Sequence, residues 1–85
     1  MMQGKRVDWN DGRILEAGEY AKSPSGVWYC CTPNGHMGNL GGHTVTEHEN
    51  GTISASPSIL VSVTNNGKRI PLWHGYLEKG IWREC

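Results

Sequence analysis

Glycine and proline recur at such short intervals along this chain that no long helix fits between them. The 85 residues include 12 Gly and 4 Pro, and no window shows the apolar period of an amphipathic helix. Short segments rich in β-branched and aromatic residues lie between these turn signals. The sequence therefore predicts an all-β, mostly antiparallel fold, a small sheet or sandwich built of hairpins.

The turn signals also predict where the strands begin and end. The expected strands are 27–31, 43–48, 52–55, 58–63, 73–77 and 81–83. Asn50-Gly51 is typical of the two-residue turn of a β-hairpin, and Asn65-Asn66-Gly67 and Glu78-Lys79-Gly80 are expected to close two further strands. Pro57 is expected to end the strand before it. A turn is also expected at 10–12, and a Gly-rich loop at 34–42.

The length of the chain suits one domain, residues 1–85, with an irregular N-terminal part at 1–25 and a β core at 26–85. Only 36% of the residues are hydrophobic, and none is Phe. Tryptophan must therefore supply much of the core volume. The three Trp residues in predicted strands, Trp28, Trp73 and Trp82, are expected to be buried, whereas Trp9 lies in an irregular stretch.

Charge and N-terminal composition limit the classes of function. Eight basic residues offset eight acidic ones, so no net field favours nucleic acid, and we do not expect it as a partner. The first twelve residues carry no apolar run, and we expect neither a signal peptide nor a membrane span. Three cysteines without a secretion signal indicate reduced thiols and a cytoplasmic protein.

The Cys and His residues predict a metal site, because a core this small often needs such support. The candidate ligands are Cys30, Cys31, His36, His43, His48, His74 and Cys85. Cys31 and His36 flank a Pro/Gly turn, and one of the two adjacent cysteines faces away from any shared site. A second pair, His74 and Cys85, completes a four-ligand structural zinc site. The alternative is that the cysteines act as small hydrophobes and the histidines as ordinary polar residues.

Other groups of polar residues give weaker evidence of a catalytic site. His43 and Glu47 share a strand face, an arrangement that suits acid–base work, although an ordinary pair on a solvated strand explains it better. His43 and His48 should point to opposite faces. The serines at 54, 56 and 58 lack the strand–turn–helix context of a serine nucleophile.

Two segments carry a family resemblance. Residues 47–60, EHENGTISASPSIL, and 73–82, WHGYLEKGIW, resemble a family of small bacterial and phage proteins, often auto-labelled "ammonia monooxygenase". The resemblance covers about residues 27–85 and implies a zinc-ribbon-like domain of phage or prophage origin. The family's Cys-x-Cys or Cys-x-x-Cys knuckle corresponds here to Cys31 and His36, and Trp73 stands where a Cys commonly precedes the last His.

The leading functional expectation is a small phage, prophage or bacterial accessory protein, a zinc-stabilised module that binds a protein partner. An exposed edge strand or the Gly-rich loop is its expected contact surface. The alternative is a metal-dependent hydrolase with an open site around His36, His43 and His74 and with Glu47 as base. A third hypothesis is that the protein is a component of a virion.

Overall fold

Nine strands and no helix make up the part of the chain that the computed structural model describes, residues 2–10 and 14–85. In chain order the strands are β1 (Met2–Gln3), β2 (Lys5–Arg6), β3 (Glu19–Lys22), β4 (Trp28–Cys31), β5 (Met37–Asn39), β6 (Thr44–Glu47), β7 (Ile53–Asn65), β8 (Lys68–Glu78) and β9 (Ile81–Glu84). The all-β expectation is confirmed.

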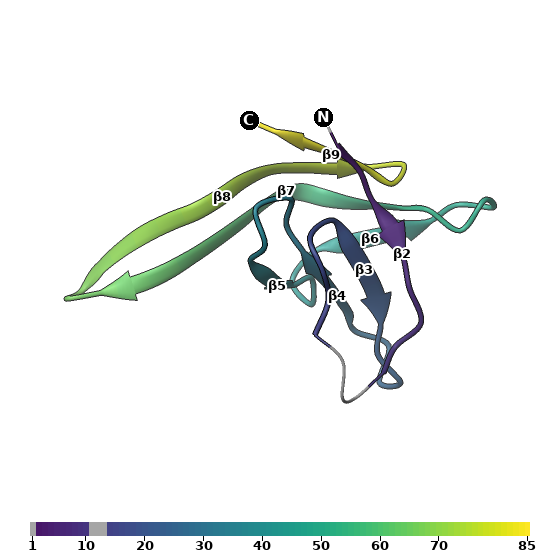
Figure 1. The fold of residues 1–85 in the computed structure, drawn as a ribbon, viewed down its shortest axis with the longest axis horizontal. Coiled ribbons are helices and arrows are strands. Elements are labelled where there is room, and N and C mark those ends of the chain that lie inside the picture. The colour runs from purple at the N-terminus through teal and green to yellow at the C-terminus, as the bar shows by residue number, and fades with distance from the viewer. Residues whose placement is uncertain (1, 11–13) are drawn as a thin grey trace.

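The strands form two sheets (Figure 1). The larger sheet has the order β1-β9-β8-β7-β6 and is antiparallel at every pairing. The smaller sheet has the order β2-β3-β4-β5, and its β2–β3 pair is parallel. Met2 pairs with Trp82, so the beginning of the described chain lies against its last strand.

The predicted hairpins are present. β6 and β7 pair in register from Thr44–Ser56 to Glu47–Ile53 around the turn that contains Asn50 and Gly51. Asn66 and Gly67 join β7 to β8 with positive φ at both residues, 52° and 77°. That backbone matches the right-handed twist of the two strands, which is why Asn-Gly is favoured there.

Three expectations need correction. Pro57 does not end a strand: it lies within β7, where pairing with β8 is irregular between Ala55 and Ile59 and pairing with β6 has stopped at Ser56. No ladder hydrogen bond therefore needs its missing N–H. Residues 1–25, expected to be irregular, contain β1, β2 and β3, and the loop expected at 34–42 contains β5. The turn expected at 10–12 lies mostly outside the described residues.

The core lies between the two sheets. Its buried members are Tyr20, Trp28, Cys30, Leu40, Ile53, Ala55, Ile59, Trp73, Leu77 and Trp82. Trp73 and Trp82 meet edge-to-face with ring centroids 5.4 Å apart. The predicted burial of the three strand Trp residues is confirmed. Trp9 packs instead on a smaller cluster on the far face of β3 and β4, around Leu15, Ala21 and Cys31.

Candidate functional site

The adjacent cysteines point to opposite faces of β4, as expected of neighbours in a strand. Cys30 lies in the core between the sheets, and Cys31 lies in the cluster on the other face. Burial, reinforced by the neighbouring Cys31, raises the pKa of the Cys30 thiol to about 12. Burial and the nearby Glu19 carboxylate raise the pKa of Cys31. Both thiols are therefore protonated at neutral pH.

The other predicted ligands lie in two places. His36 follows the turn between β4 and β5, where its backbone N–H donates to Thr32 Oγ1 at 3.0 Å. His74 lies within β8, beside Cys85, which follows the end of β9, and the Cys85 N–H donates to the His74 carbonyl at 3.0 Å. His74 and Cys85 are both exposed, whereas Cys31 is buried.

In this structure the four predicted zinc ligands are not gathered around one point. Within residues 2–10 and 14–85, no three His, Cys, Asp or Glu side chains gather as ligands for one ion. The zinc ion and the ligand set Cys31, His36, His74 and Cys85 stay predictions from the sequence.

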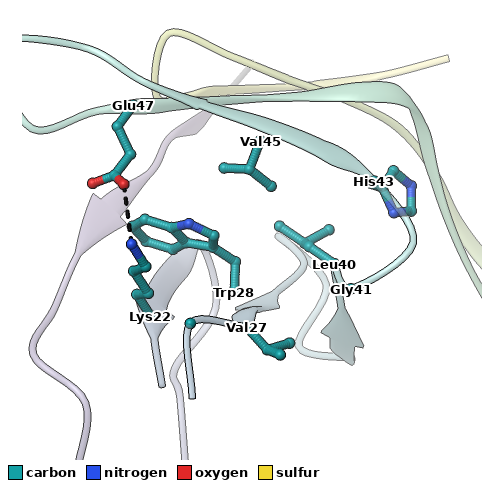
Figure 2. Close-up of a pocket in the computed structure, with 9 residues that line it drawn as sticks. Lys22, Val27, Trp28, Leu40, Gly41, His43, Val45 and Glu47 are labelled. Carbon is teal, nitrogen blue, oxygen red and sulfur yellow. Dashed lines mark hydrogen bonds and ion pairs between the residues drawn. The ribbon is translucent and has the colours of Figure 1, made fainter. Parts of the chain in front are cut away.

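A cleft of about 330 Å³ lies between β6 of the larger sheet and strands β3 and β4 of the smaller sheet (Figure 2). Its apolar wall is formed by Trp28, Leu40 and Val45. At one end Glu47 accepts from Lys22 Nζ at 3.3 Å. The second Glu47 oxygen lies 3.4 Å from the Arg6 guanidinium, which stacks over the Trp28 ring.

His43 lines the same cleft at its other end (Figure 2). Its Nε2 lies 3.1 Å from the Ser58 carbonyl, an acceptor, so Nε2 carries the proton and donates. Nδ1 is buried and has no hydrogen-bond partner among the described residues. The shared face of His43 and Glu47 is thus confirmed, but Glu47 pairs with two cations and His43 with a backbone carbonyl. Neither group is arranged for proton transfer to the other.

Two Ser–His hydrogen bonds lie on the outer face of the larger sheet, and sequence reasoning missed both. His48 Nε2 is 2.8 Å from Ser54 Oγ, and His74 Nε2 is 3.0 Å from Ser58 Oγ. The hairpin register was the available signal, since it places His48 diagonally across from Ser54 on one face. Ser54 Oγ also accepts the Lys79 N–H at 2.8 Å, so this hydroxyl is held as part of the turn.

The most prominent surface feature is a two-stranded arm formed by β7 and β8 beyond the Leu60–His74 pair (Figure 1). The arm runs past the rest of the sheet, because β6 pairs only with residues 53–56 of β7 and β9 only with residues 75–78 of β8. All residues from 63 to 71 are exposed. Val63 and Ile70, cross-strand partners on one face, are 45% and 42% exposed.

The two long edges of the arm differ in chemistry. The β8 edge carries Lys68, Arg69 and Pro71, which are residues that discourage the addition of another strand. The β7 edge from residue 58 to residue 65 carries no charged residue and no proline. Within the described part of the chain, no strand pairs with this stretch on the side away from β8.

Comparisons with protein-family models, with curated proteins and with solved structures gave no match for this chain. The described residues include no helix that is long and apolar enough to cross a membrane. The fold and site therefore define this protein as an all-β domain of two packed sheets with a projecting β-hairpin arm. The family resemblance and its phage origin stay predictions.

Proposed function

We propose that this chain is a protein-binding module that recognises a partner by accepting an extended strand at the open edge of β7. The observation that carries the proposal is the uncharged edge 58–65 on a projecting arm. Main-chain hydrogen bonds supply affinity in this mode of recognition, and side chains on alternate positions supply specificity.

The backbone orientation of β7 supports this binding mode. The Ser58 carbonyl points away from β8, because it accepts from His43 on the β6 side. Backbone groups alternate along a strand, so the N–H and C=O groups of Leu60, Ser62 and Thr64 point the same way. The pairing of β7 with β8 shifts between Val61 and Ser62, where the unpaired extra residue is Leu72 on β8. Because the extra residue is not on β7, the alternation along β7 is unchanged.

Side-chain chemistry adds specificity to the backbone contact. Leu60 lies on the outer face of the arm, and Val63 and Ile70 lie on the inner face. A strand added beside β7 would place its own alternate side chains next to these residues on both faces. Apolar or β-branched partner side chains are favoured, because no charge on residues 58–65 offers an ion pair.

The test uses a fluorescein-labelled synthetic peptide of alternating Val and Thr, titrated with dilute full-length protein. We expect saturable binding by fluorescence anisotropy. The matched control is the same peptide with proline at alternate positions, which lacks the N–H groups that a ladder needs. Equal binding of both peptides, or binding of neither, would contradict strand addition.

Three of the predicted zinc ligands, Cys31, His36 and Cys85, lie outside β7 and β8. The fourth, His74, lies on β8 and pairs with Leu60 at the base of the arm, so a metal held there would steady the base of the arm. The hydrolase alternative needs His36, His43 and His74 around one ion. His43 and His74 do both contact Ser58, but no described residue joins them in a group of three ligands.

A further inference from the structure

We propose that the partner strand comes from a second copy of this chain, through antiparallel pairing of the two β7 edges about a two-fold axis at Val61. This inference rests on the proposed function, since it names the occupant of the same edge. A two-fold interface uses one surface twice, so that surface must be complementary to itself.

The sequence of β7 meets this requirement. Residues 58–64 read Ser-Ile-Leu-Val-Ser-Val-Thr, a segment nearly symmetric about its central Val61. Antiparallel pairing centred there sets Ser58 against Thr64 and Ile59 against Val63. On the outer face Ser58 thus meets Thr64 and Leu60 meets Ser62, and on the inner face the β-branched Ile59 and Val63 are set against each other. Aliphatic and Thr–Ser pairs of this kind stabilise strand pairing.

The same register satisfies the backbone at Leu60 and Ser62, while the Ser58 carbonyl already accepts from His43. It sets Leu60 opposite Ser62 of the second copy, and both residues direct their N–H and C=O groups toward the open edge. Each such pair exchanges two hydrogen bonds, so the two symmetry-related pairs form about four. Val61, whose backbone groups face β8, meets its own copy as a close non-hydrogen-bonded pair.

Charge explains why β7 rather than β8 is the self-pairing edge. No charged residue lies between positions 58 and 65, so two copies bring no like charges together. Pairing of β8 with a second β8 would bring Lys68 and Arg69 toward cations of the other copy and would place Pro71, which has no N–H, in the ladder.

The first experiment measures mass in solution by sedimentation equilibrium. We expect the full-length protein to approach twice its chain mass of 9.4 kDa as concentration rises. The double variant Leu60→Lys/Ser62→Lys sets lysine opposite lysine in both pairs and should raise the dissociation constant at least about tenfold. The variant Leu60→Glu/Ser62→Glu should behave alike, and mixing the two should restore a dimer. Ile14→Lys/Glu84→Lys, at two exposed positions outside β6 and β7, is the control that should leave dimerisation unchanged.

The second experiment tests the register. In a Cys85→Ser background, Val61→Cys should form a disulfide between copies under mild oxidation, because Cα atoms of a non-hydrogen-bonded pair lie about 4.5 Å apart. Val63→Cys, opposite Ile59 of the other copy, should cross-link less. This measurement does not depend on how well the lysine variants fold.

The outcomes separate the two proposals. A wild-type protein that stays monomeric but binds the Val/Thr peptide overturns self-pairing and leaves strand recognition in place. A dimer that survives the lysine variants and gives no Val61→Cys cross-link overturns this interface. A monomer that binds neither peptide overturns both proposals.

Discussion

The indole N–H of Trp82 donates to the carbonyl of Gly18 at 3.0 Å, a buried hydrogen bond that joins β9 of one sheet to the segment just before β3 of the other. Trp82 is 1% exposed and packs edge-to-face on Trp73. One side chain thus links the two sheets both by apolar packing and by a hydrogen bond between residues 64 apart in the sequence.

Trp82→Ala should destabilise the protein by about 3–5 kcal/mol, because it removes a large buried side chain and leaves a cavity. This loss is comparable to the whole stability of many small domains, so the variant should be largely unfolded. Trp9→Ala, in the smaller and partly exposed cluster, should lose less. Urea denaturation followed by circular dichroism checks both variants, and a native-like Trp82→Ala beside an unfolded Trp9→Ala would reverse the assignment of the core.

Gly75→Ala should also be strongly destabilising. A Cβ atom at this position would overlap the Arg83 carbonyl on β9 and the ring of Trp73. Relief requires the two strands to move apart, and overpacking of this kind typically costs about 1–3 kcal/mol. Gly42→Ala is the matched control, since nothing lies within 4 Å of the added Cβ. Equal melting temperatures for the two variants would contradict the close packing at Gly75.

The buried thiol of Cys30 should make stability depend on alkaline pH. Its pKa is raised to about 12 from the usual 9.0 by burial and by Cys31. Above about pH 9 the unfolded chain loses this proton while the folded chain retains it, so the free energy of unfolding falls as pH rises toward about 12. Urea titrations at several pH values should show a shallower fall for Cys30→Ala. Identical slopes would show that Cys30 is not the group responsible.

Thiol labelling should distinguish the three cysteines. Cys85 is exposed, whereas Cys30 and Cys31 are 0% and 2% exposed and free of disulfide. Ellman's reagent at neutral pH should therefore react with one thiol per chain quickly and with the other two only after unfolding. Cys85→Ser should abolish the fast phase, and fast reaction of two or more thiols would contradict the burial of the β4 cysteines.

Cys85→Ser also tests the predicted zinc site. The Cys85 backbone N–H, which donates to His74, is kept in the variant, and the side chain is exposed. If Cys85 is a zinc ligand, the variant should lose zinc and thermal stability together, as measured by elemental analysis and thermal melting. An unchanged melting temperature with unchanged metal content would exclude Cys85 as a ligand.

The secondary structure of this chain is largely determined by its local sequence. Asn50-Gly51, Asn66-Gly67 and Lys79-Gly80 tolerate the positive φ values that hairpin turns need, and the β-branched runs between them favour strands. The burial of Trp28, Trp73 and Trp82 followed from the same pattern, since alternate residues of a strand share a face. These properties depend on neighbours within a few residues, so they could be predicted from the sequence.

Tertiary structure alone decided which strands meet and where the candidate site lies. β2 and β3 were missed because their pairing joins residues 5–6 to 19–20, and β1 because it pairs with the distant β9. Pro57 stays within a strand only because both of its neighbours leave a gap in pairing. The arm is exposed because β6 and β9 are much shorter than β7 and β8. Whether a strand edge is covered depends on the lengths and order of its neighbours, which the residues of that strand do not encode.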